Sequence, residues 1–385
     1  MISRENSGIH YLEQYELVSS KLLNWCQLLG TVPYPLDLRS FSEPQSVHQS
    51  TELLLRSIQL LSTSLICVYY GLSVHRMFHD ISGWKLYSFV LFLLSYTLNA
   101  LCIPLVFVTC HRLKKRYREL STKIGGLLYA YQQQGFEIKP KVLLKWHRNV
   151  LVGFGAVLIL TIILKIMDKF SKGPLFAIGV DLLPEVIAVS CLIQYFYAMA
   201  IVRLIVRCSS IMISELKPVQ DTLLVKRKLT FLLRRVRIVV EISNEVDRSF
   251  GIFVLLQLLL IIVVGSRVLW CAAWFYDLKT VEPDDAYYLV YSFLLGFVQG
   301  LKLVLITYPH HSILCEMQMI GIKTCLINNK ENFEMVLKLS ELTLMLQHGF
   351  KSCGIILVNM TLIPKIIAMV ITNFIADIQL GGHSW

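Results

Sequence analysis

The chain has 385 residues, of which 55 % are hydrophobic and 16 % are charged, and its formal net charge is +11. A mean hydropathy of +0.60 excludes a soluble globular domain and predicts an all-α, polytopic membrane protein. The positive charge comes without a separate folded basic domain, so we expect no nucleic-acid partner.

The chain begins with a charged segment, residues 1–56, that lacks the short apolar core and the cleavage site of a signal peptide. We expect this segment to be cytoplasmic and to contain a short helix before the first span. Residues 57–380 are then expected to form a single seven-helix membrane domain, because neither a linker nor an internal repeat divides them.

Seven segments are long and apolar enough to cross a bilayer, which takes about 20 helical residues. The predicted spans are approximately residues 57–74, 86–109, 149–164, 175–202, 249–274, 286–308 and 353–380. Arg267 in the fifth span and Lys302 in the sixth lie near span ends, so their side chains are expected to reach the interface.

Basic residues indicate the orientation of these spans. Lysine and arginine gather in the connections after the second and fourth spans, whereas the connection after the fifth span is short and acidic. Since positively charged loops stay in the cytoplasm, the amino terminus is predicted inside and the carboxyl terminus outside, the reverse of a G-protein-coupled receptor.

The loops at about residues 110–148, 203–248 and 309–351 are predicted to be cytoplasmic helical extensions. The apolar stripes of the first two loops require a partner, and we expect the long helices to extend below the membrane and pack together there, with membrane-surface binding as the alternative. The stripe after the fourth span consists of Leu229, Leu232, Leu233, Val236, Val239 and Val240.

The last span, residues 353–380, has one polar and one apolar side when its residues are placed about 100° apart on a helix. The polar and small side contains Lys365, Ala368, Thr372, Asn373, Ala376, Asp377 and Gln379. This sorting suggests a helix that lines water, because a helix surrounded by lipid has no reason for it. The alternative is a polar stripe buried against neighbouring helices.

Candidate ligand contacts lie in the predicted outer half: Asp181, Glu185, Trp274 and Tyr291. Acidic groups at membrane depth without a visible partner favour a cationic, alkaloid-like ligand, and inward-facing aromatic rings could wall its pocket. Two alternatives remain open. The fourth span could start at Val186 and leave both acids at the interface, and the aromatic residues could form an interfacial belt.

No sequence motif indicates catalysis. Phosphate loops, zinc-protease motifs and nucleophile elbows are absent from the sequence, so we expect neither an enzyme nor a cofactor. The cysteines are scattered and form no metal-ligand spacing, and the His310-His311 pair has no third ligand, so no metal site is expected.

Three short motifs resemble insect gustatory receptors. That family ends its seventh helix with Thr-Tyr, five mostly hydrophobic residues and Gln-Phe, and this chain has Thr372-Asn373, five residues and Gln379-Leu380. Cys353-Gly354 is similar to the pair that precedes this helix in the family. The stretch from Gly30 to Tyr34 is similar to the Gly-x-x-Pro-aromatic stretch before the first span.

The resemblance, which extends to insect odorant receptors, implies a ligand-gated non-selective cation channel in a sensory-neuron plasma membrane. It implies a homo- or hetero-tetramer with other receptor subunits, each contributing its last helix to a central pore. Gln379 and Leu380 match the gate positions and Thr372 the start of the motif, with Ala376 and Asp377 between them.

The chain departs from the family motif in two places, since Asn373 replaces tyrosine and Leu380 replaces phenylalanine. Phe374 stands where sugar-sensing members have glutamate, which favours bitter or other non-sugar tastants. The alternative functions are a metabotropic G-protein-coupled chemoreceptor and a membrane transporter.

Overall fold

The computed structural model describes residues 175–216, 222–277, 283–325, 333–349, 351–352 and 356–381, together with parts of 57–75, 90–107 and 123–166. Its elements in chain order are α5 (Leu175–Ser214), α6 (Thr222–Asp277), α7 (Pro283–Cys325), α8 (Phe333–Gly349), β1 (Lys351–Ser352), β2 (Ile356–Leu357) and α9 (Leu362–Gly381). The predicted all-α membrane class is confirmed.

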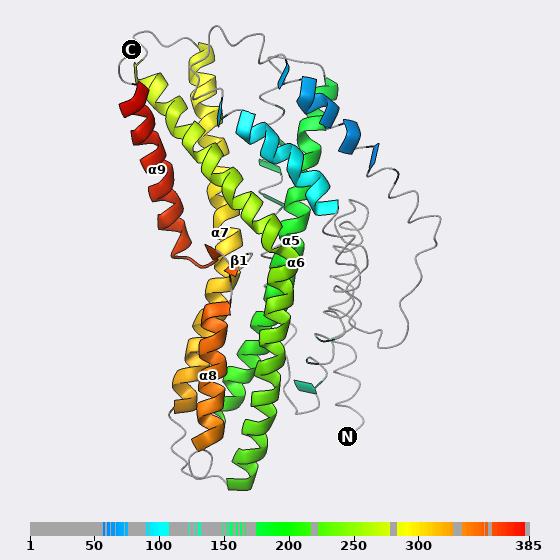
Figure 1. Cartoon of the computed structure of the whole chain (residues 1–385), viewed down its shortest axis with the longest axis vertical. Coiled ribbons are helices and arrows are strands. Elements are labelled where there is room, and N and C mark those ends of the chain that lie inside the picture. The colour runs from blue at the N-terminus through cyan, green and yellow to red at the C-terminus, as the bar shows by residue number, and fades with distance from the viewer. Residues whose placement is uncertain are drawn as a thin grey trace.

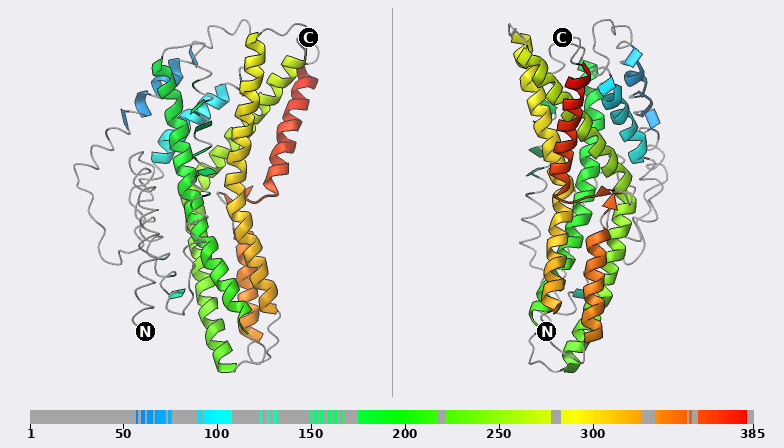
Figure 2. Two further views of the ribbon diagram at one scale, coloured as in Figure 1. Left: turned by 180° about the vertical axis from the view of Figure 1, so that it is seen from behind. Right: turned by 60° about the vertical axis from the view of Figure 1, so that its left-hand side comes forward.

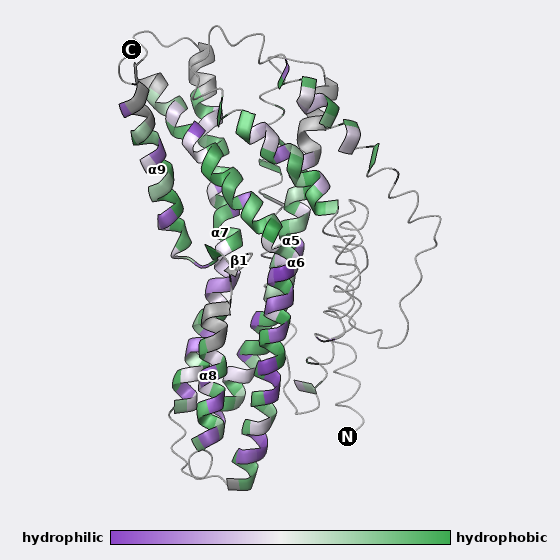
Figure 3. Ribbon diagram, in the orientation of Figure 1, coloured by the Kyte–Doolittle hydropathy of each residue, from purple (hydrophilic) through white to green (hydrophobic). Residues whose placement is uncertain are grey.

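Three helices are much longer than a bilayer is thick. The 40, 56 and 43 residues of α5, α6 and α7 correspond to lengths of about 60, 84 and 65 Å, against a hydrocarbon core of about 30 Å. They run side by side for much of their length (Figures 1 and 2), and α6 changes from a largely hydrophobic half to a half rich in hydrophilic residues (Figure 3).

The first six spans expected from the sequence correspond to helices wherever the structure describes them, and the last one does so from Leu362 onward. Within the described residues, the helices long and apolar enough to cross a membrane are Pro184–Ser214, Leu223–Ala273 and Leu289–Cys325. Shorter apolar helices cover Thr63–Leu72, Leu93–Phe107 and Leu362–Ala376. The third expected span is described only in part, and its described residues are helical.

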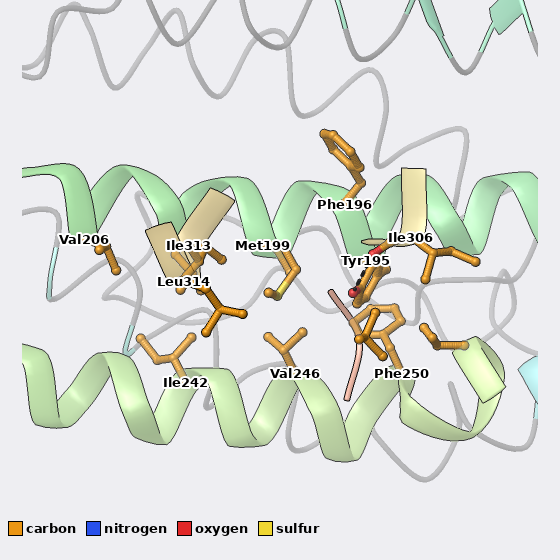
Figure 4. Packing of buried hydrophobic residues seen from close by; sticks show 14 of the residues in the cluster. Tyr195, Phe196, Met199, Val206, Ile242, Val246, Phe250, Ile306, Ile313 and Leu314 are labelled. Carbon is orange, nitrogen blue, oxygen red and sulfur yellow. Dashed lines mark hydrogen bonds between the residues drawn. The ribbon is translucent and has the colours of Figure 1, made fainter. Parts of the chain in front are cut away.

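Apolar side chains from the three long helices interdigitate to form the core between them. Met199 of α5, Val246 of α6 and Ile313 of α7 are each buried in one continuous cluster (Figure 4). The foot of α6, residues 222–248, carries the apolar stripe that was expected to need a partner, and Leu229, Leu232, Val236 and Val239 of this stripe are buried within this chain. This stripe therefore packs inside one chain and is not available to a second chain.

The start of the last helix also differs from the expected start at residue 353. Strands β1 and β2 pair antiparallel, with Lys351 opposite Leu357 and Ser352 opposite Ile356. The chain turns at Asn359, whose side-chain oxygen accepts a hydrogen bond from the Thr361 amide at 3.1 Å. Helix α9 begins only after this turn, and it runs beside α6 and α7 (Figure 1).

Candidate functional site

Helix α9 is attached to the rest of the chain along a narrow stripe. Leu362 and Ile366 are buried, with 9 % and 6 % of their surface exposed. One turn further on, Val370 packs against Gly265 of α6, where the nearest Val370 methyl carbon lies 3.3 Å from the position that a β-carbon on Gly265 would take. The missing side chain of Gly265 therefore lets the two helices approach closely.

The remaining surface of α9 has two sides of different chemistry. Ile367, Ile371 and Ile375 form an apolar side and are 51 %, 44 % and 47 % exposed. Lys365, Ala368, Thr372 and Gln379 form a polar and small side and are also exposed. At about 100° per residue, these two sides and the buried stripe divide the helix circumference into three arcs.

The other residues expected at the pore are described less completely. Ala376 is half-buried, and Asn373 is exposed. The side chains of Asp377 and Leu380 lie outside the described part of the structure, although both residues belong to α9.

A buried ion pair joins α5 to α7. The ammonium group of Lys302 donates to the carboxylate of Glu185, and the two side chains are 0 % and 10 % exposed. The expectation that Lys302 reaches the interface is therefore wrong. The reason given for a cationic ligand also fails for Glu185, because its partner is present in the chain.

Two further polar residues extend this cluster to the neighbouring helices. The side-chain amide of Gln257 in α6 donates to the Cys102 sulfur at 3.4 Å, and both residues are buried. Gln299 is buried one turn of α7 before Lys302. Sequence reasoning missed these residues, although glutamines inside apolar spans are the signal that could have found them.

Of the other expected ligand contacts, only Tyr291 has a described side chain, and it is 6 % exposed. Tyr291 therefore lies inside the protein, in the hydrophobic cluster. The side chains of Asp181 and Trp274 lie outside the described part of the structure.

A second polar contact lies beside Pro309, which stands inside α7. The Tyr195 hydroxyl donates to the Ile306 carbonyl at 3.3 Å (Figure 4). The same hydroxyl hydrogen-bonds the His310 ring. On the same stretch, the Thr307 hydroxyl lies 3.4 Å from the sulfur of Met360, just before α9. Across the described residues, no group of three or more His, Cys, Asp or Glu side chains is placed to hold a metal ion.

Long apolar helices with ionisable and amide groups buried between them define a multi-pass helical membrane protein. The sequence matches the family described as 7tm Chemosensory receptor over residues 22–380, so the chain belongs to this family of insect chemosensory receptors. This match confirms the resemblance to insect chemoreceptors that was inferred from the three short motifs. The protein is therefore a receptor and not an enzyme.

The fold is similar to that of the insect olfactory receptor OR5 from Machilis hrabei, solved in complex with eugenol. The two chains are 11 % identical with a TM-score of 0.56, and the match covers 96 % of this chain and 99 % of the other. A comparison with curated proteins finds no match.

Proposed function

We propose that this receptor is a gustatory receptor for bitter or other non-sugar cues, acting as a ligand-gated non-selective cation channel in the plasma membrane of a sensory dendrite. The observation that carries the channel proposal is the three-sided surface of α9. The buried stripe of α9 holds the helix to α6, and its isoleucine side suits lipid or a neighbouring subunit. The polar side, from Lys365 to Gln379, suits contact with water.

Four copies of α9 around an axis would satisfy all three sides at once. The polar side would face the central path, and Gln379 would place an amide ring at its outer end beside the Leu380 ring. Amides can hydrogen-bond one another when the pore is shut and replace part of a cation's hydration when it is open, while leucines gate by excluding water. Partner subunits of the same family would fit the same arrangement.

Cysteine accessibility tests the orientation of α9 directly. We expect cysteine at Thr372 or Ala368 to react with a membrane-impermeant thiol reagent while ligand is present, and the reaction to block the current. Cysteine at Ile371 or Ile375, on the apolar side, is the matched control and should not react. The unsubstituted chain sets the background, because Cys67, Cys315 and Cys325 are exposed.

Two outcomes of this experiment would contradict the pore proposal. Equal reaction at the Thr372 and Ile371 positions means that no water-filled path runs along one side of α9. The second is that the reagent blocks the current at neither position although the ligand responses of the cells are intact, which would place the permeation path elsewhere.

The ligand site is proposed in the outer half of the chain, near the Glu185–Lys302 pair and Tyr291, with Asp181 and Trp274 as further candidates. Since Glu185 is already paired with Lys302, it supplies no reason to require a cationic ligand. Whole-cell recording with bitter compounds, sugars and volatile odorants, with and without candidate partner subunits, tests the sensory class. Activation by sugars alone would contradict the assignment to non-sugar cues.

A further inference from the structure

The foot of α6 carries a groove lined by positive charge that the channel proposal does not use. Its volume is about 400 Å³, and it is lined by Leu223, Lys226, Arg227, Thr230, Phe231, Arg234 and Arg235. All seven residues lie within half of the helix circumference, opposite the buried side formed by Leu229, Leu232 and Val236. The lining is therefore the outward face of α6.

The four cations of this groove have no carboxylate partner among the residues that the structure describes. The described ion pairs of α6 use other basic residues: Arg237 pairs with Glu241 at 4.0 Å, and Arg248 pairs with Glu245 at 3.3 Å. Uncompensated positive charge around a concave surface attracts anions, and concavity raises the local potential.

One arginine of the groove is already held in position. The Arg235 guanidinium lies 5.0 Å from the centre of the Phe231 ring, and its Nε atom is buried without a hydrogen-bond partner. The contact with the Phe231 ring restricts the Arg235 side chain before any ligand binds. An arginine that is fixed before binding also loses less conformational entropy when it binds.

The spacing of the cations indicates the shape of the anion. Lys226 and Arg227 lie two turns, or about 12 Å along the axis, from Arg234 and Arg235, and the Thr230 hydroxyl lies between the two doublets. Arginine binds phosphate with paired hydrogen bonds. A volume of this size suits a small molecule, since ligand pockets measure roughly 300–1,000 Å³.

The distance from the bilayer favours a soluble ligand over a lipid. The apolar span of α6 begins at about residue 249. Arg235 lies about 21 Å and Lys226 about 35 Å beyond this point along the helix, whereas the headgroup layer of one leaflet is about 5–8 Å thick. We propose that this groove binds a soluble, multiply charged organic phosphate with phosphates on opposite sides, of the inositol polyphosphate kind.

Binding to the purified full-length chain in neutral phosphatidylcholine nanodiscs tests the proposal, with inositol hexakisphosphate as the probe and isothermal titration calorimetry at physiological ionic strength as the readout. We expect saturable binding that weakens as salt is added. Replacing Arg234→Gln and Arg235→Gln together should weaken it at least about tenfold, because charge-assisted hydrogen bonds are lost.

A second double variant, Lys226→Gln with Arg227→Gln, should give the same loss and alters only exposed side chains, so its folding should be unaffected. The matched control, Arg237→Gln with Arg248→Gln, removes the same charge outside the groove and should leave affinity within about twofold. None of these measurements depends on ligand-gated current, so the result is independent of the channel proposal.

The proposal is overturned by any of three results. The first is that the probe does not bind saturably. The second is an equal loss of affinity in the control variant, which would indicate only the diffuse electrostatic field of the basic residues. The third is that the groove binds a phosphoinositide lipid in the nanodisc but not the soluble probe.

Discussion

Lys302 and Glu185 show how much a pair of side chains can constrain a membrane protein. Both side chains are buried inside the helical core, and the attraction between the ammonium and carboxylate groups offsets part of the large cost of removing both from water. Since the pair joins α5 to α7 directly, it also fixes the relative height of the two helices. A slip of either helix by one turn, about 5.4 Å, would separate the charges.

Replacing Lys302→Met is predicted to destabilise the folded chain by about 3–5 kcal/mol, because Glu185 would be left buried without a counter-charge. The exchange Glu185→Lys with Lys302→Glu should recover much of the loss, since it restores an ion pair at the same place. Thermal melting of the detergent-solubilised protein measures both effects.

The exposed pair of Glu334 and Lys338, one turn apart on α8, is the control for this prediction. Lys338→Met should change the melting temperature little, because water screens an exposed pair. A Lys302→Met chain that melts as the unsubstituted chain does would show that Glu185 is neutral or hydrated in the folded protein.

At the residue scale, the sequence predicts which charged residues lie at membrane depth, but it does not predict which of them pair. Glu185 and Lys302 are 117 positions apart, and no periodicity within either span relates one to the other. The side on which each helix meets its neighbours decides whether a lysine side chain extends to the membrane–water interface or pairs with a carboxylate of another helix. That information lies in the packing of the whole core.

Helix α9 shows the same limit at the scale of an element. Its amphipathic division could be predicted because a helical period of about 3.6 residues sorts its polar and apolar positions. Its start could not be predicted, because residues 353–358 are almost as apolar as a span. Ile356 and Leu357 instead pair with β1, and the helix, which begins at Leu362, is shorter than the apolar run.

The substitution Gly265→Val is predicted to push α9 away from α6 and raise the current that flows without ligand. The nearest carbon of Val370 is 3.3 Å from the first added atom, and the two methyl groups would come closer still. Whole-cell recording of leak current, normalised to surface protein, measures the effect.

Gly300→Val on α7 is the matched control, because a β-carbon there meets nothing within 4 Å. It should leave the leak current unchanged. An equal change in both variants would mean that loss of glycine flexibility, and not displacement of α9, is responsible.

The orientation of the whole molecule is the most direct prediction from its charge pattern. An epitope tag after Trp385 should be stained on intact cells, whereas one before Met1 should require permeabilisation, because the basic connections keep the amino terminus inside. An internal tag in the acidic connection at residues 275–285 is an independent control and should also be stained from outside. Staining in the opposite pattern would refute both the orientation and the extracellular exit of the proposed pore.

The overall helical architecture was accessible from the sequence, whereas the way that the chain buries its apolar stripes was not. The length and hydropathy of the spans decide how many times a chain can cross a bilayer. The stripe at the foot of α6 required a partner, and the long helices were expected to pack together, but the pattern did not decide whether that partner belongs to the same chain or to a second subunit. Helical periodicity identifies a buried side without identifying what covers it.

The three-sided surface of α9 has a consequence for biosynthesis. A newly made, single subunit would hold a lysine, a threonine and a glutamine of α9 against acyl chains that offer them no hydrogen bonds, at a cost of up to a few kcal/mol for the charge alone. On the proposed tetramer, we expect such a lone subunit to be held by chaperones or degraded before it joins its partners. Delivery to the cell surface should therefore depend on the supply of companion subunits, and the cell would regulate sensitivity by controlling assembly as well as transcription.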